Sequence, residues 1–123
     1  MKYLGLAYFT PEKFAAMAPD DVKALVSQCP PLDAKMQATG KVLVSASLGD
    51  LDRWKTLRPR KGTTRVTDGP YTEAKEVVGG LFIIEADSED EALQIASMHP
   101  AATLGEDGGW VVELIPMDFY LGR

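Results

Sequence analysis

The sequence predicts an α+β domain, because strand-like and helix-like segments alternate along the chain in the order strand, helix, strand, hairpin, strand, helix, strand. Two further observations agree with this fold class. The chain has 123 residues, the usual size of one domain, and it contains no evident internal repeat. Hydrophobic residues make up 46% of it and charged residues 25%, as in globular proteins. We therefore expect residues 1–123 to form a single domain.

The N-terminal part predicts a strand followed by a helix. Residues Lys2–Phe9 are rich in aliphatic and aromatic side chains on both faces and end at Thr10-Pro11, as a first strand would. Asp20 or Asp21 is placed to cap a helix, because a carboxylate accepts hydrogen bonds from the free amides of the first turn. One apolar stripe at helical spacing follows, made of Val22, Leu25, Val26 and Cys29.

Two adjacent prolines predict that this helix is interrupted. Pro30 and Pro31 lack amide donors, and Pro31 disfavours helical geometry at the residue before it. Pro31 suits the first position of a second helical segment, which turns Leu32 and Met36 inward and ends at Gly40. The segment Lys41–Leu48 then alternates as a strand, with Val42, Val44, Ala46 and Leu48 on one face and Leu43, Ser45 and Ser47 on the other.

The middle of the chain predicts an exposed hairpin and then the most apolar strand. Arg53–Leu57 and Thr63–Thr67 are short, polar, strand-like segments joined through Pro59 and Gly62. Val77–Glu85 is a β-branched and aromatic run. Its Gly79-Gly80 pair indicates a β-bulge or a close backbone approach.

The last third predicts a helix and a closing strand. Ser88 and Glu91 have the spacing of a capping box, which opens a helix that ends before Pro100. Trp110–Ile115 completes the set as the final strand. The resulting order, with the hairpin as an insertion, is the ferredoxin-like βαββαβ arrangement.

The predicted sheet has more apolar surface than its helices can cover. Both helical layers of this topology pack on one face, whereas Tyr3–Phe9 and Leu81–Ile84 are apolar on both faces. A second copy packed sheet to sheet would cover the remaining face. We therefore expect a homodimer that forms a dimeric α+β barrel. The apolar tail Phe119–Leu121 packs either across that interface or on its own subunit.

Composition argues against several classes of function. Thirteen Lys and Arg against eighteen Asp and Glu give a net charge of −5, which repels a nucleic-acid backbone. The apolar run Tyr3–Phe9 is too short to span a membrane, and it meets Pro11 and charged residues where a secretory segment would continue. Cys29 is the only cysteine, so no intramolecular disulfide can form. We expect a cytoplasmic protein that binds neither nucleic acid nor membranes.

One segment resembles the signature of a known family. The ten residues Thr67–Glu76 (TDGPYTEAKE), followed by Gly79-Gly80, resemble the DGPF branch of the YCII-related family, with Tyr71 in place of the Phe. Two features depart from the family pattern. Ile115 stands where members often carry Arg, so carboxylate binding by that Arg is not expected, and Pro30-Pro31 interrupts a helix that is usually continuous. The resemblance extends over nearly the whole chain, through Met1-Lys2-Tyr3, Asp90-Glu91-Ala92 and Val112–Pro116.

The resemblance implies a dimeric α+β barrel, similar to muconolactone isomerase and small monooxygenases, with a cleft beside each DGPF segment. A related member type is a dehydrochlorinase that acts on a chlorinated hydroxyhydroquinone. DGPF proteins also resemble partners encoded near extracytoplasmic-function sigma factors. The His and Asp pair proposed as the active site of the family has its His elsewhere in the chain, so we do not transfer that role to His99.

Asp68 is the leading candidate for a catalytic base, because the Gly69-Pro70 turn holds it at a strand end, where partial desolvation would favour its protonated form. The alternative is an ordinary turn carboxylate that accepts hydrogen bonds from nearby amides. His99, the only histidine, is a candidate acid or base, although its place after a helix favours a cation set against the helix dipole. The candidate ligand-binding residues are Tyr71, Glu73, Lys75, Ser45 and Ser47.

The sequence therefore favours a domain that binds a small molecule. One hypothesis is a cofactor-free isomerase or lyase that acts on a small cyclic acid or phenol, with Asp68 as the base. The alternative is a non-catalytic regulatory or protein-interaction module linked to transcription initiation, and it rests on the family resemblance alone. A single His and a single Cys do not make a usual zinc motif, so we expect neither a metal nor a cofactor.

Overall fold

The computed structural model describes residues 1–122 and confirms the ferredoxin-like α+β topology. Four strands form one antiparallel sheet in the order β2-β5-β1-β6, which is the ferredoxin-like order once the hairpin is left out. The predicted hairpin is a separate two-stranded sheet of β3 and β4, and we call its residues Lys55–Asp68 the arm. The strands are β1 (Lys2–Phe9), β2 (Val42–Ser47), β3 (Lys55–Arg60), β4 (Thr63–Asp68), β5 (Val77–Glu85) and β6 (Val111–Pro116).

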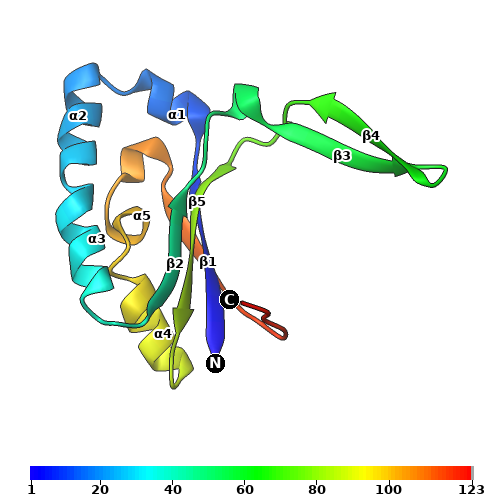
Figure 1. The fold of residues 1–123 in the computed structure, drawn as a ribbon. Coiled ribbons are helices and arrows are strands. Elements are labelled where there is room, and N and C mark those ends of the chain that lie inside the picture. The colour runs from blue at the N-terminus through cyan, green and yellow to red at the C-terminus, as the bar shows by residue number, and fades with distance from the viewer. Residues whose placement is uncertain (123) are drawn as a thin grey trace.

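Helices α2, α3 and α5 lie on one side of the four-stranded sheet, and the arm and the C-terminal segment extend from the other side (Figure 1). Within residues 1–122, no helix is long and apolar enough to cross a membrane. Short 3₁₀ turns occupy Leu51–Arg53 and Glu106–Gly108. The helices are α1 (Pro11–Ala16), α2 (Pro19–Ser27), α3 (Cys29–Gln37), α4 (Glu89–Ala96) and α5 (Pro100–Thr103).

Proline determines where several helices begin, and this corrects two predictions. The prediction that Asp20 or Asp21 caps α2 is wrong, since Ala18 is the N-cap and no side chain caps it. Pro19 starts the helix instead, because its fixed φ suits the first turn. The helix break is confirmed, but it falls at Gln28, so both prolines lie in the first turn of α3. The short helix α1 was not predicted, and it also begins at a proline.

A β-bulge changes the faces predicted for β2. Val42 pairs with Ile84, and Val44 pairs with Ile83, so one extra residue, Leu43, separates the two pairs. Val42 therefore packs with the core on the helix side, while Val44 and Ala46 lie on the opposite side. The prediction that these three share one face is wrong for Val42. The bulge predicted at Gly79-Gly80 is confirmed by a register shift between β1 and β5.

Phe82 and Ile84 of β5 are fully buried at the centre of the core. They lie between the sheet and α3 and α4, which contribute Met36 and Ile95. Gly5 of β1 is directly opposite Phe82, and its missing side chain provides the space for the Phe82 ring. The other side of the sheet has no helix over it. We call this side the open face, and its apolar residues include Leu4, Leu6, Val44, Leu81, Ile83 and Ile115.

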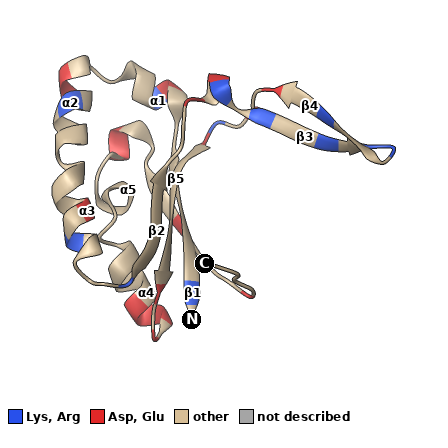
Figure 2. Ribbon diagram, viewed as in Figure 1, with Lys and Arg blue, Asp and Glu red and all other residues tan. Residues whose placement is uncertain are grey.

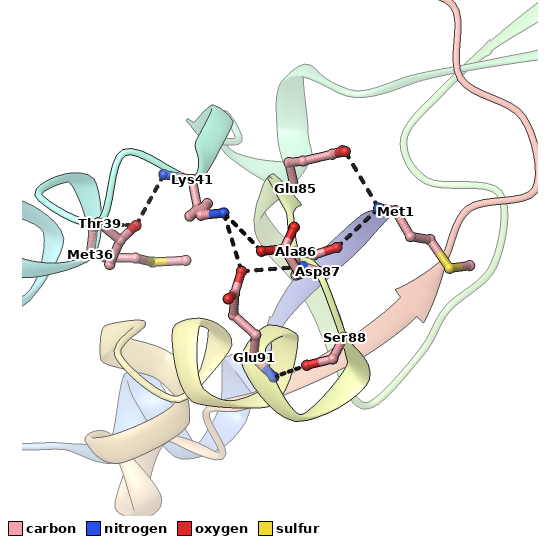
Figure 3. Close-up of polar contacts among 9 residues, drawn as sticks. All are labelled: Met1, Met36, Thr39, Lys41, Glu85, Ala86, Asp87, Ser88 and Glu91. Atoms are coloured by element: carbon pink, nitrogen blue, oxygen red, sulfur yellow. Dashed lines mark hydrogen bonds and ion pairs between the residues drawn. The ribbon is translucent and has the colours of Figure 1, made fainter.

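A polar network closes the end of the sheet farthest from the arm (Figure 3). The Ser88 hydroxyl accepts a hydrogen bond from the Glu91 amide at 3.1 Å, as the capping box predicts. The Glu91 carboxylate accepts from the Asp87 amide at 3.3 Å and pairs with the Lys41 ammonium at 3.4 Å. The N-terminal ammonium of Met1 donates to the Ala86 carbonyl at 2.9 Å. These bonds join the starts of β1, β2 and α4 to the end of β5.

We expect Gly5→Ala to lower the free energy of unfolding by about 1–3 kcal/mol, because the new methyl group would overlap the Phe82 ring. Urea unfolding measures the change. A second variant that combines Gly5→Ala with Phe82→Leu should recover part of the loss, because the smaller side chain makes room for the methyl group. Equal stabilities of Gly5→Ala and the wild type would contradict this account of the core.

Candidate functional site

A cavity of about 470 Å³ lies between the sheet and helices α1, α3 and α5. It exists because the sheet residues that face the helices change in size along the strands. At one end Tyr3, Phe82 and Ile84 fill the space and form the core. At the other end the sheet presents small groups, and the space above them is not filled. These groups are Ala7, Ser45, Ser47, Gly79 and Gly80.

Aromatic side chains form much of the remaining wall. Trp110, which directly precedes β6, stacks on Phe14 of α1 with ring centroids 6.3 Å apart. Phe14 in turn meets Phe9 edge to face at 6.1 Å. Trp54 lines the cavity beside the root of the arm. Such walls suit a ligand with a flat, apolar ring, since aromatic rings stack on one another.

His99 lines the same cavity, and its environment favours the neutral imidazole. Its ring stacks on Phe82 with centroids 5.0 Å apart, and its Nδ1 accepts a hydrogen bond from the Ala101 amide at 3.1 Å. Burial lowers the pKa of His99, and the nearby Asp33 carboxylate opposes this shift. Because Nδ1 is an acceptor, the neutral ring carries its proton on Nε2. His99 can therefore donate a hydrogen bond through Nε2–H.

This environment corrects the structural role expected for His99. The preceding helix α4 ends at Ala96, and His99 is the N-cap of the short helix α5, so it does not act as a cation at a helix C-terminus. Proline again explains the difference. Pro100 restarts the helix and turns the imidazole back toward the first amides of α5, where a neutral nitrogen is the favoured acceptor.

Helix α3 places two further groups at the cavity, Cys29 and Asp33. Burial raises the pKa of the Cys29 thiol, and the Asp33 carboxylate raises it further, so the neutral thiol is favoured. A protonated thiol is a poor nucleophile. Asp33 is exposed, and it supplies a carboxylate to the cavity from the helix side, while Asp50 supplies another from the approach to the arm. No cluster of three or more His, Cys, Asp or Glu side chains suited to a metal ion occurs in residues 1–122.

The structure separates the predicted site residues into two groups. Ser45, Ser47 and His99 line the cavity together. Asp68, at the end of β4, is not among the lining residues. Tyr71, Glu73 and Lys75 are exposed in the segment between β4 and β5 and do not line the cavity either. Within one chain, the expected single cleft that holds both groups is therefore absent from the described residues.

Asp68 has the properties of a surface ion pair. Its side chain is 87% exposed and pairs with the Lys55 ammonium directly across the hairpin, at 2.5 Å. The hydrogen bond from Lys55 and its positive charge lower the pKa of the Asp68 carboxylate. A carboxylate with a lowered pKa is a weaker base, so this geometry does not favour the catalytic role predicted from the sequence. Tyr71 is 69% exposed, and the Arg58 guanidinium lies 4.8 Å from its ring centroid.

Asp33, Trp54 and Trp110 are cavity residues that the sequence analysis did not identify. No local motif marks them, because they come from α3, from the approach to the arm and from the approach to β6. Only the packing of these elements brings them together. The small residues at one end of β1, β2 and β5 were a usable signal, since a sheet face without large side chains leaves space under its helices.

The strand order, the inserted hairpin and the cavity beneath the helices define a ferredoxin-like α+β domain with an internal cavity. The sequence model of the family described as YCII-related domain matches residues 1–117, and the chain belongs to this family. Membership of its DGPF branch stays a prediction. An uncharacterized protein of Rhizobium meliloti (strain 1021) is 31% identical over 96 residues, which cover 78% of this chain and 77% of the relative.

Among solved structures, the chain is similar to 5-chloro-2-hydroxyhydroquinone dehydrochlorinase (TftG) from Burkholderia phenoliruptrix AC1100, in complex with 2,5-dihydroxybenzoquinone. The two chains are 20% identical, and the TM-score is 0.43. The matched region covers 96% of this chain and 94% of the other.

The lowered pKa of His99 predicts a pH dependence of stability. Between that pKa and the ordinary value of about 6.5, the unfolded chain binds a proton more readily than the folded chain. The stabilisation from neutral His99 is therefore complete above about pH 6.5 and is lost as the pH falls through the lowered pKa. Urea unfolding at several pH values should show this loss in the wild type.

The variant His99→Asn is the matched control, because Asn keeps an acceptor for the Ala101 amide but does not titrate. It should lack the part of the pH dependence that the wild type shows below about pH 6.5. Since His99 is the only histidine, NMR can follow its ring resonance without overlap from others. Titration at or above the ordinary pKa in the folded protein would contradict the assignment.

Proposed function

We propose that this YCII-related domain binds a small cyclic acid or phenol in the cavity and promotes proton transfer on it, as a cofactor-free isomerase or lyase. One observation carries the proposal: the neutral imidazole of His99 and the hydroxyls of Ser45 and Ser47 border one cavity of about 470 Å³ with aromatic walls. Volumes of about 300–1,000 Å³ are usual for small-molecule sites, in which few polar groups orient a mostly apolar ligand.

The same groups support a specific proton transfer. The Asp33 carboxylate would accept a proton from a carbon next to a carbonyl group, and the electron pair of that C–H bond would move toward the carbonyl oxygen. Nε2–H of His99 would donate a hydrogen bond to this oxygen as its negative charge develops. Return of the proton to another carbon completes an isomerisation, and departure of a leaving group completes an elimination. Ser45 and Ser47 would orient the ring.

A homodimer formed through the open face is the second part of the proposal. The open face is apolar, and helices pack only on its opposite side (Figure 1). A standard interface of roughly 1,600 Å², a little over half of it apolar, would contribute on the order of 20 kcal/mol before the costs of association. We also propose a cytoplasmic location, because a lone cysteine fits a reducing compartment.

A thermal-shift screen of small acids, phenols and lactones tests the binding proposal. A ligand present at about 100 times its Kd adds about 2.7 kcal/mol to the free energy of unfolding, which raises the melting temperature measurably. We expect His99→Asn to weaken binding of any hit by about tenfold, the value of one lost hydrogen bond. Asp33→Asn should retain most of the binding and abolish turnover of a substrate.

Asp68→Asn is the control for this experiment, since Asp68 is a carboxylate outside the cavity. It should bind and turn over the hit as the wild type does. If Asp68→Asn abolishes turnover while His99→Asn and Asp33→Asn leave it intact, the base is Asp68 and the cavity assignment is wrong.

Sedimentation velocity tests the open-face dimer. We expect the wild type to sediment as a dimer and Ile83→Asp to sediment as a monomer, because a buried, unpaired carboxylate would oppose association. Leu93→Asp is the matched control, since Leu93 is exposed on α4, away from the open face. Circular dichroism checks that each variant is folded. A dimeric Ile83→Asp protein would place the interface elsewhere.

A further inference from the structure

The arm pairs with no other part of the chain described here. Strands β3 and β4 pair as strands only with each other, from Lys55 opposite Asp68 to Arg60 opposite Thr63. Lys61 and Gly62 have positive φ values of 50° and 81°, which suit the tight turn of a two-residue hairpin. A lone two-stranded ribbon is at best marginally stable in water. The arm therefore has the geometry of a segment that is stabilised by contact with another surface.

One side of the arm is apolar beyond the Lys55–Asp68 ion pair at its root. Leu57 and Val66 are directly opposite each other, and their side chains are 64% and 57% exposed. The next pair on the same side is Pro59 and Thr64, since every second pair of a ribbon shares a face. Because contact with another apolar surface would remove both side chains from water, this pair is suited to docking.

The other side of the arm is cationic. Arg58 is directly opposite Arg65, and like charges in this position repel each other unless an anion lies between them. Residues 55–68 contain five basic residues and one acidic residue, a net charge of +4. The whole chain has a net charge of −5, so the remaining residues carry −9. Figure 2 shows this separation, with blue bands along the arm and red segments on the helical body.

A second copy of the chain fits both sides of the arm. Its acidic body complements the charge of the arm, and an apolar surface on it could cover Leu57 and Val66. A nucleic acid fits less well, since the acidic body of the same chain repels it. The exposed pair Leu57 and Val66 would also gain no favourable contact with a charged phosphate backbone. Figure 1 shows the arm on the side of the sheet opposite the helices, so a copy packed on the open face would lie beside it.

The root of the arm is also part of the cavity wall. Gly49, Leu51 and Trp54 line the cavity where the chain approaches β3. The Trp54 indole donates to the Gly49 carbonyl at 2.9 Å, and the Gly69 amide, directly after β4, donates to the Trp54 carbonyl at 2.8 Å. A displacement of the arm would therefore move Trp54, which is bonded to the residue that follows β4.

We infer that the arm clasps a second copy of this chain and that this contact fixes the cavity wall at Gly49–Trp54. The inference rests on the open-face dimer proposed above, and it makes ligand binding depend on self-association. The arm is then a structural link between the interface of the dimer and the site of each subunit.

Sedimentation velocity over a dilution series tests the clasp with two matched variants. Leu57→Asp adds a charge to the apolar side of the arm, and Thr63→Asp adds the same charge near its tip on the other side. We expect Leu57→Asp to raise the dissociation constant of the dimer at least tenfold more than Thr63→Asp does. A dimer that weakens equally in both variants, or in neither, overturns the clasp and leaves the open-face dimer standing. A wild type that is monomeric at roughly 100 µM overturns both.

Tryptophan fluorescence tests the link to the cavity without any ligand. Trp54 and Trp110 are the only tryptophans, so Trp110→Phe isolates the emission of Trp54. We expect this emission to shift on dilution with the same midpoint as dissociation of the dimer. In the Leu57→Asp background, the shift should move to higher protein concentration. Emission that stays constant while the dimer dissociates overturns the link, whatever the outcome of the ligand screen.

Discussion

Phe82 is the side chain on which both the core and the cavity depend. Its ring occupies the space left by Gly5, is fully buried between the sheet and the helices, and stacks on the imidazole of His99. On one side of this ring, large buried side chains pack together and form the core. On the other side, small residues leave the cavity. The transition from core to cavity is therefore a change in side-chain size along the same strands, without any change of fold.

The ring stack also determines the chemistry available in the cavity. It holds the imidazole in a partly buried position, where the charged form is disfavoured, while the Ala101 amide occupies Nδ1. Nε2–H is therefore the hydrogen-bond donor of the ring, and the packing of the ring against Phe82 sets the direction of this donor. Prolines set this arrangement, since Pro100 restarts the helix directly after His99, and Pro30 and Pro31 lie in the first turn of the helix that bears Asp33. The site depends on where short helices begin.

In the dimer proposed here, the arm and the open face would extend this dependence beyond one chain. An uncovered apolar sheet and an isolated basic ribbon lie on the same side of the molecule, and an acidic helical body lies on the other (Figure 2). These features are unfavourable in isolation and complementary between copies. Because the root of the ribbon is a wall of the cavity, assembly and ligand binding in this family member would share a structural element, Trp54.

The sequence alone predicted the six strands, the longer helices and their order. Long apolar runs such as Val77–Glu85, the capping pair Ser88 and Glu91, and the glycine bulge are local patterns, and local physics is enough to predict them. It placed Ser45, Ser47 and His99 among the candidates, but it paired them with Asp68 and missed Asp33. Only the tertiary structure decided which of these groups meet, because a cavity is formed by side chains from distant segments and by the space that small residues leave. The bulge at Leu43 is a shift of one residue, yet it moves Val42 to the opposite face of β2 from the one predicted. The helix start at Pro100 is equally local, yet it places His99 where the neutral imidazole is favoured over the predicted cation.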